Sequence, residues 1–212
     1  MNILHFATGP YATNCYIAVS DGIADVIDPG MHSASAINDY LSENNLALGN
    51  IILTHGHIDH VRDAGELAHH HGASVYIHKA DAFMLNEQIG FNEQARILFD
   101  VTSMRLVHNP QWLEPGSTIA IAGQDFTVHH CPGHSPGSVI LQGKKLAFSG
   151  DVLFEGSVGR TDLPFSSPEE MTKTLKDIVL SLPDDLAILP GHGAHTTMRV
   201  ERKSNPFLQE LS

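Results

Sequence analysis

The chain has 212 residues, of which 42% are hydrophobic and 17% charged, so it can bury a sizeable core and lacks the composition of a disordered protein. Acidic side chains outnumber basic ones by 24 to 12, and the resulting charge of −12 argues against a nucleic-acid partner because it repels phosphate backbones. No apolar run approaches the roughly 20 residues that cross a bilayer, so no membrane partner is expected. No Lys or Arg precedes Arg62 to form the basic start of an export signal, and a cytoplasmic location is expected.

The first half of the chain predicts a group of strands followed by a strand–helix–strand unit. Three short β-rich segments form an antiparallel meander that ends at the turn Asp28-Pro29-Gly30: residues 3–8, 14–19 and 24–27. Ser33 is expected to cap a helix. The βαβ unit consists of a buried strand, a helix that Gly72 ends, and a second strand: residues 50–54, about 59 to 71, and 73–78. Residues 80–104 are mixed in character and mainly helical.

The second half repeats this order, with short strands before a helix. Four segments separated by turns that contain glycine are predicted strands: residues 118–122, 125–130, 138–141 and 146–148. Ser167, Pro168 and Glu170 form a capping box with proline at the first helical position, which starts a helix that reaches about residue 180. A last strand is predicted at 186–189. The pattern favours an α+β fold in which two β-plus-helix halves pack sheet against sheet.

A dense cluster of metal-binding residue types follows the buried strand of the first half: Thr54-His55-Gly56-His57-Ile58-Asp59-His60. His55 and His57, two positions apart in an extended loop, can both face one ion. Asp59 and His60 at the start of the helix are rotated toward a neighbouring position, so the spacing suggests two metal sites. A mixed set of imidazole and carboxylate ligands favours Zn²⁺, with Fe as the alternative and Mn²⁺ as a poorer fit.

Three later segments each place a further potential ligand directly after a glycine, at the end of a predicted strand: Gly133-His134, Gly150-Asp151 and Gly191-His192. Glycine permits the tight turns that bring side chains from several strand ends to a shared point. Cys131 could also be a ligand, but nitrogen and oxygen ligands already suffice, so we expect a buried thiol. Because Cys15 is the only other cysteine, no disulfide framework is expected.

The order of these motifs resembles the metallo-β-lactamase superfamily. Six segments are most similar to its glyoxalase II, or hydroxyacylglutathione hydrolase, branch: residues 54–60, 132–137, 149–151, 159–162, 190–193 and 205–207. The resemblance implies an αββα sandwich of two mixed β-sheets flanked by helices, formed by one domain over residues 1–212, with the site at one edge of the sheets. It also implies seven metal ligands in three groups: His55, His57 and His134 at one ion, Asp59, His60 and His192 at the other, and Asp151 as a bridge.

The chain departs from full-length glyoxalase II after His192. Only 20 residues follow, so the helical glutathione-binding extension of that branch is not expected, and Gln209 stands where the branch has an arginine that grips glutathione. The resemblance is therefore closest to compact bacterial hydrolases of this kind. Arg199, Arg202 and Lys203 could replace part of the lost grip, although a solvated basic turn is the simpler interpretation.

These features predict a binuclear metal-dependent hydrolase of small acyl thioesters such as S-lactoylglutathione, with weak dependence on the glutathione part. Two ions can share one water and lower its pKa, and Asp59 would be the catalytic carboxylate that orients this water. A thiol has a pKa of about 8.5, so the thiolate leaves with little help from a general acid. Arg160 and Asp162 are expected to pair and hold their loop rather than contact substrate.

Other functions of this superfamily need different features. A β-lactamase would need export and a nuclease would need a basic surface, and the sequence predicts neither. A degenerate binding scaffold usually lacks ligands, and none is missing here. A persulfide dioxygenase would need only one iron, held by His55, His134 and Asp151, and stays an alternative, as does a lactonase-type hydrolase. Nothing in the sequence indicates an oligomeric state.

Overall fold

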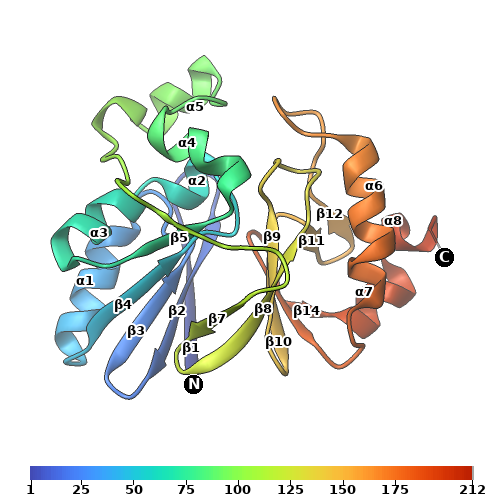
Figure 1. The fold of residues 1–212 in the computed structure, drawn as a ribbon, viewed down its shortest axis with the longest axis horizontal. Helices are drawn as coiled ribbons and strands as arrows, with labels where there is room; N and C mark the ends of the chain where they lie inside the picture. The colour runs from blue at the N-terminus through green and yellow to red at the C-terminus, as the bar shows by residue number, and fades with distance from the viewer. Residues whose placement is uncertain (212) are drawn as a thin grey trace.

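Two six-stranded β-sheets face each other at the centre of the computed structural model, which describes residues 1–211 (Figure 1). The first sheet has the strand order β1 (Asn2–Thr8), β2 (Thr13–Ser20), β3 (Ile23–Ile27), β4 (Ala47–Ile52), β5 (Val75–Ile77) and β6 (Gln111–Trp112). The second has the order β14 (Thr196–Thr197), β13 (Ala187–Pro190), β10 (Leu146–Gly150), β9 (Val139–Gln142), β8 (Gln124–His130) and β7 (Thr118–Ile121). A hairpin of β11 (Leu153–Phe154) and β12 (Ser157–Val158) lies beside the second sheet.

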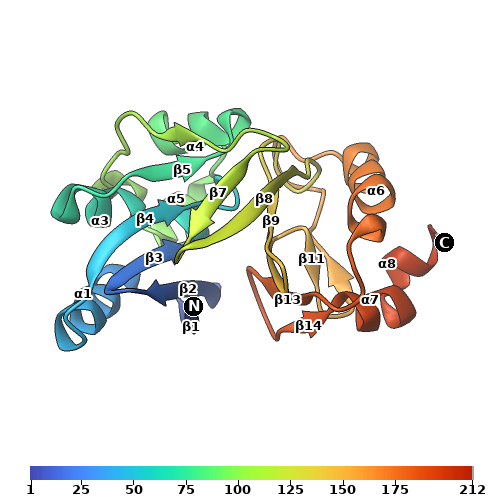
Figure 2. The ribbon, with the colours of Figure 1, turned by 60° about the horizontal axis from the view of Figure 1, so that its bottom comes forward.

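Helices lie on the outer side of each sheet (Figures 1 and 2). On the side of the first sheet they are α1 (Ser33–Glu43), α2 (Ile58–Val61), α3 (Ala64–His71), α4 (Ala82–Asn86) and α5 (Glu93–Leu98). On the side of the second they are α6 (Pro168–Asp177), α7 (Met198–Ser204) and α8 (Pro206–Gln209). This order of layers confirms the predicted αββα sandwich. No helix within residues 1–211 is both long enough and apolar enough to cross a membrane.

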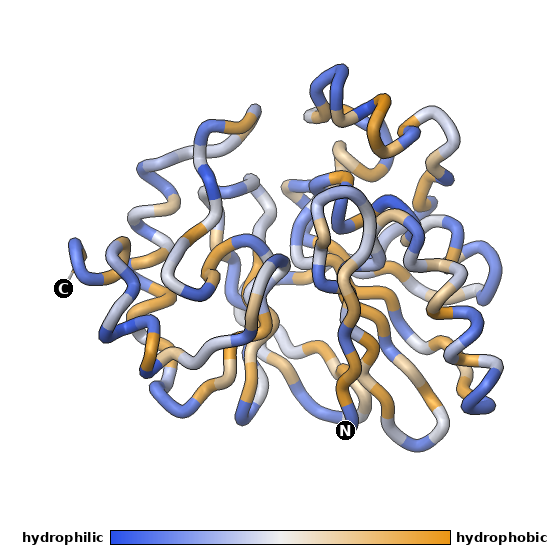
Figure 3. Tube along the Cα trace, turned by 180° about the vertical axis from the view of Figure 1, so that it is seen from behind, coloured by the Kyte–Doolittle hydropathy of each residue, from blue (hydrophilic) through white to orange (hydrophobic). Residues whose placement is uncertain are grey.

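Three apolar cores fill the spaces between the four layers. A single strand can contribute side chains to two of these cores, because successive side chains of a strand point to opposite faces. Along β2, Cys15 and Ile17 pack with the core of the first helical layer, whereas Tyr16 and Ala18 pack with the core between the two sheets. The third core lies between the second sheet and α6 to α8. Apolar residues accordingly follow the central strands in Figure 3, while polar residues gather in the loops.

The strand directions bring several strand ends to one edge of the second sheet. β9 is antiparallel to both β8 and β10, and β10 is parallel to β13. β8, β10 and β13 therefore run in the same direction, and their carboxyl ends meet at one edge. In the first sheet, β1 to β3 form the predicted antiparallel meander and β4 is parallel to β5, as expected for a βαβ unit.

Two helix predictions in the first half were wrong in detail. The helix expected from 59 to 71 is two short helices, because the Asp63 N–H donates to the Pro29 carbonyl at 3.1 Å instead of to a helical carbonyl. Ser33 is the first residue of α1 and not its cap, since His32 occupies the N-cap position with φ of 70°. The Asp63 carboxylate accepts from the Ala34 N–H at 3.0 Å. A backbone N–H at the start of α1 thus finds its acceptor in Asp63, 29 positions further along the chain.

The helix predicted in the second half begins as expected, because Ser167 Oγ accepts from the Glu170 N–H at 3.2 Å and Pro168 is the first helical residue. The prediction of a basic turn at residues 199–203 was wrong. These residues belong to α7, whose first turn is capped by the side chain of Thr197. The side chain of Asn205 then caps α8. β6, β11, β12 and β14 were not predicted, since a strand of two residues carries no alternating pattern.

Candidate metal centre

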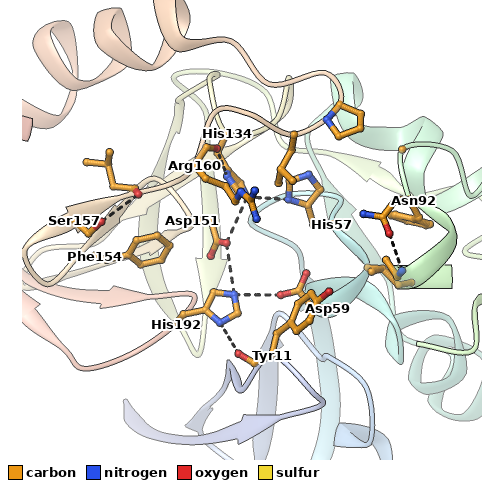
Figure 4. A pocket seen from close by; sticks show the side chains of 17 residues that line it. Tyr11, His57, Asp59, Asn92, His134, Asp151, Phe154, Ser157, Arg160 and His192 are labelled. Atoms are coloured by element: carbon orange, nitrogen blue, oxygen red, sulfur yellow. Dashed lines mark hydrogen bonds and ion pairs between the residues drawn. The ribbon is translucent and has the colours of Figure 1, made fainter. Parts of the chain in front are cut away.

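Seven histidine and aspartate side chains converge at the edge where strands of both sheets end. Those that also line the cavity are labelled in Figure 4: His57, Asp59, His134, Asp151 and His192. The loop after β4 and the start of α2 supply four of them: His55, His57, Asp59 and His60. The loops after β8, β10 and β13 supply the others: His134, Asp151 and His192. The structure thus brings together every residue that was predicted from the sequence to be a ligand.

The first group consists of three imidazoles whose nitrogen atoms face a common point. His57 Nδ1 lies 2.8 Å from His134 Nε2 and 3.1 Å from His55 Nε2. Ligand nitrogens about 2.0 to 2.1 Å from a tetrahedral zinc ion are themselves about 3.3 Å apart. These three nitrogens are therefore spaced nearly as the ligands of one ion would be.

The second group combines one carboxylate with two imidazoles. Asp59 Oδ2 lies 3.4 Å from His60 Nε2 and 3.1 Å from His192 Nε2. The two ring nitrogens are 3.3 Å apart. All three distances again match the spacing of ligands around one ion.

Asp151 lies between the two groups. Its Oδ2 is 3.4 Å from His134 Nε2 and 3.5 Å from His192 Nε2, and its Oδ1 is 3.3 Å from His60 Nε2. Oδ1 is buried and makes no hydrogen bond with the residues that the structure describes. A buried carboxylate oxygen without such a partner destabilises the fold. A cation bound to this oxygen would offset that loss of free energy. The donor set therefore fits two metal ions that share Asp151.

The second ring nitrogen of four histidines is held by a partner outside the cluster. The pairs are His55 with Thr54 Oγ1 at 3.1 Å, His60 with Asp28 Oδ2 at 3.0 Å, His134 with the Arg160 carbonyl at 2.9 Å, and His192 with the Tyr11 carbonyl at 3.1 Å. Such partners fix the tautomer and the orientation of histidines that bind metals. Each contact directs the opposite nitrogen of its ring into the centre.

The charge states of the cluster suit a cation. Burial, and next the neighbouring His134, lower the pKa of His57 to about 3, and burial together with His60 holds the pKa of His55 well below its usual value. Both imidazoles are thus neutral near pH 7, the form that binds metals. Burial opposes ionisation of Asp151, but the nearby His60 outweighs it and lowers the pKa of Asp151 to about 2. Burial opposes protonation of His60, but Asp151, Asp59 and Asp28 outweigh it and raise the pKa of His60 well above its usual value. The ionised carboxylates thus face a positive charge that bound cations would replace.

Two supporting residues were not predicted to be functional. Asp28 had been interpreted only as part of a turn, yet its Oδ2 accepts from Thr54 Oγ1 at 2.6 Å as well as contacting His60. Thr13 donates its hydroxyl to Asp59 Oδ2 at 2.9 Å. No local signal could have shown these contacts, because the partners lie 26 and 46 positions apart in the chain.

Asp81, also not predicted, connects the two loops that carry the first group of ligands. Its carboxylate is buried and accepts from the Gly56 N–H at 2.8 Å, the Ser135 hydroxyl at 2.7 Å and the Gly137 N–H at 2.6 Å. Gly56 separates His55 from His57, and Ser135 follows His134. Burial raises the pKa of Asp81, although the hydrogen bonds oppose this effect. One carboxylate therefore fixes the relative position of both loops.

The glycines before the later ligands act in two ways. Gly150 has a φ of 49°, so it makes the tight turn that was predicted. Gly191 is required for a different reason. A Cβ atom at this position would lie 2.1 Å from Asp151 Oδ1 and 2.6 Å from His60 Cε1. Any larger residue would displace two side chains of the centre.

Cys131 and the basic residues of α7 lie outside the cluster. The Cys131 thiol is buried in the third core, as predicted, and burial raises its pKa to about 12. Arg202 donates to Asp184 Oδ1 and to the carbonyls of Leu180 and Leu182, each at 2.7 Å. Because these contacts engage its guanidinium, Arg202 holds α7 in place and is not free to replace a glutathione grip.

A cavity of about 640 Å³ opens over the centre, within the size range of small-molecule sites. His57, Asp59, His134, Asp151 and His192 all line it. Arg160 lies at its side and donates to Asp162 Oδ1 at 2.6 Å and to Oδ2 at 2.7 Å, which confirms the predicted pairing. Substrate can thus reach both groups of ligands from one cavity.

Residues 8–192 match the model of the metallo-β-lactamase superfamily, and the chain belongs to this superfamily. The hydroxyacylglutathione hydrolase GloC of Haemophilus influenzae is 36% identical over 217 residues, which cover all of both chains. The crystal structure of the B3 metallo-beta-lactamase BLEG-1 is 31% identical, with a TM-score of 0.86 over 98% of this chain and 99% of its own. That of TTHA1623 in a di-iron-bound form is 33% identical, with a TM-score of 0.80 over 97% of this chain and all of its own.

Proposed function

We propose that the chain is a binuclear metal-dependent hydrolase that cleaves small acyl thioesters, S-lactoylglutathione among them. The observation that carries this proposal is the presence of two ligand groups, each at ligand spacing, on either side of Asp151. The similarity to a hydroxyacylglutathione hydrolase over the whole of both chains supports the class of reaction.

The metal ligands that we propose are those predicted from the sequence: His55, His57 and His134 for one ion, Asp59, His60 and His192 for the other, and Asp151 for both. Such a pair of ions lowers the pKa of a bound water and stabilises negative charge on a carbonyl oxygen. The imidazole-rich donor set favours Zn²⁺. The di-iron-bound form of a structural relative makes Fe the alternative.

We assign to Asp59 the orientation of the attacking water. This side chain lines the cavity, and the hydroxyl of Thr13 fixes its Oδ2. Burial opposes the ionisation of Asp59, but His60 and His192 outweigh it and hold its pKa below the usual value. The carboxylate is thus ionised near pH 7 and can accept a hydrogen bond from water. The departing thiolate needs no acid, because its pKa is only about 8.5.

We further propose that recognition of glutathione is weak. Gln209, at the position where the glyoxalase II branch has its arginine, donates to the Arg202 carbonyl at 2.6 Å and does not line the cavity. Arg202 is itself engaged by Asp184 and two carbonyls. Neither side chain is placed to receive a glutathione carboxylate, so little binding energy from that part of the substrate can lower the barrier.

The test compares kcat/KM for S-lactoylglutathione with kcat/KM for a lactoyl ester of a small neutral thiol, in the wild type and in Arg202→Ala. We expect hydrolysis of both esters, with the two values within about tenfold, a difference of about 1.4 kcal/mol. The ratio should be unchanged in Arg202→Ala. A preference above tenfold for the glutathione ester would contradict weak recognition, and its loss in Arg202→Ala would assign that recognition to Arg202.

Failure to hydrolyse either ester would contradict the thioesterase proposal itself. Oxygen consumption with a persulfide substrate and one iron per chain would then favour a dioxygenase. Hydrolysis of cyclic esters alone would favour a lactonase.

A further inference from the structure

The cavity over the metal centre has apolar walls on two opposite sides. The wall next to α2 and α5 is formed by Ile58, Phe91 and Ala95, and the wall next to the β11–β12 hairpin by Phe154, Val158 and Leu163. Figure 4 shows the two sides, with Phe154 on one, Asn92 on the other and the histidines and aspartates of the centre between them. A substrate whose reacting carbonyl lies over the centre would therefore extend an arm toward each wall.

Positive charge is nearly absent from these walls. Arg160 is the one Lys or Arg among the residues in the described chain, 1–211, that line the cavity. Two hydrogen bonds to Asp162 already compensate its guanidinium. Glutathione brings two carboxylates, and each would need a hydrogen-bonded cationic partner to leave water without loss of free energy. The net charge of −12 adds no attraction for an anion.

We propose that the preferred substrate is a thioester of an apolar acyl chain several carbons long with a small, uncharged thiol. This inference rests on the proposed hydrolase function and adds the class of substrate. Water would add to the thioester carbonyl and the carbon–sulfur bond would break, which gives a carboxylate, a thiol and one proton. The acyl chain and the thiol part of the substrate would each lie along one of the two apolar walls, where each methylene group is removed from water.

The first arm of the experiment varies the acyl chain. We would measure kcat/KM of the metal-loaded enzyme for the acetyl, butyryl and hexanoyl esters of N-acetylcysteamine, which is small and neutral. Burial of one methylene group changes an equilibrium about three- to fourfold, so kcat/KM should rise about a hundredfold from acetyl to hexanoyl. Calorimetric binding of the corresponding non-hydrolysable thioethers should rise in the same order.

Variants of the two walls test where the chain lies. Phe91→Ala or Phe154→Ala, depending on which wall receives the acyl chain, should reduce the hexanoyl-to-acetyl ratio at least tenfold. Phe207→Ala is the matched control, because Phe207 lies on α8, is 44% exposed and does not line the cavity. Since each ratio is measured on one preparation, partial loss of folded protein does not change it.

The second arm of the experiment varies the thiol, with hexanoyl-glutathione compared to hexanoyl-N-acetylcysteamine. We expect the neutral thiol ester to be hydrolysed at least as efficiently. A hexanoyl-to-acetyl ratio near one, a ratio unchanged in both wall variants, or a preference above tenfold for the glutathione ester would overturn the proposal. These results differ from failure of the proposed function, in which no thioester is hydrolysed, the lactoyl ester included.

Discussion

Asp151 connects the two groups of ligands through both of its carboxylate oxygens. Asp151→Ala should therefore lose both ions and lower kcat/KM more than about 100-fold, since even loss of an outer partner of a ligand costs 10- to 100-fold. Elemental analysis after gel filtration measures the first effect and thioester hydrolysis the second. Cys131→Ser is the control and should keep its metal, because the thiol packs in the third core. Metal loss in this control would show that the ligand set is wrong.

Asp81 offers a separate test, because it touches the loops that carry the first group of ligands but is not itself a ligand. In Asp81→Asn an amide NH₂ would replace one oxygen and face N–H or O–H donors. We expect the affinity for one of the two ions to fall about 10- to 100-fold, while the other ion stays bound. Competition with a chelator would resolve the two steps. Asp125→Asn, at an exposed position near the start of β8, should change neither step.

The residues that converge at the candidate centre could be predicted from the sequence, whereas their supporting residues could not. His55 to His60 form a dense local pattern, and each later ligand directly follows a glycine at the end of a strand. Thr13 and Asp81 are ordinary polar residues in the sequence. Their roles arise because the fold brings Thr13 to Asp59, 46 positions away, and Asp81 to Gly137, 56 positions away.

The helix α7 is attached to the β11–β12 hairpin through the buried carboxylate of Glu201. This carboxylate accepts from the Gly156 N–H at 2.8 Å and from the Thr196 hydroxyl at 2.6 Å. Asn205 donates to the same carboxylate at 2.9 Å and to the Ser157 carbonyl at 3.0 Å. The hairpin carries Phe154, which lines the cavity. The short helix α7 therefore supports one wall of the candidate site.

Glu201→Gln should weaken this attachment, because the amide NH₂ cannot accept the hydrogen bonds of the carboxylate. We expect the free energy of unfolding to fall by about 1 to 3 kcal/mol, the usual effect of one unsatisfied buried group. KM should rise more than kcat falls, because the wall and not the metal centre is disturbed. Denaturant unfolding and steady-state kinetics test the two effects. Unchanged KM and stability, equal to those of the exposed control Glu43→Gln, would contradict this role.

The elements with a repeating pattern were predictable, and those defined by distant contacts were not. The pattern of Ser167, Pro168 and Glu170 correctly placed the start of α6, because its cap is formed by neighbours in the sequence. The break between α2 and α3 depends on a hydrogen bond from Asp63 to Pro29, which no local pattern shows. The two-residue strands depend in the same way on their partners.

For the whole molecule, the sequence predicted the layers but not the order of the strands. Short β-rich segments indicated strands, and a repeated strand-then-helix order indicated two similar halves. β10 and β13 pair in parallel although the whole of α6 lies between them in the sequence. Their pairing could therefore not be predicted from neighbouring segments. This pairing places Asp151 and His192 at adjacent strand ends, and thus at one centre.

We propose that two metal ions, and not one, form the working centre. The most direct measurement adds Zn²⁺, and separately Fe²⁺, in known amounts to chelator-treated protein and follows bound metal and thioester hydrolysis in the same samples. We predict that hydrolysis rises until close to two ions are bound per chain, because the seven ligands exceed what one four- to six-coordinate ion can use. Full activity at one ion per chain, with no further gain from a second, would contradict a binuclear centre.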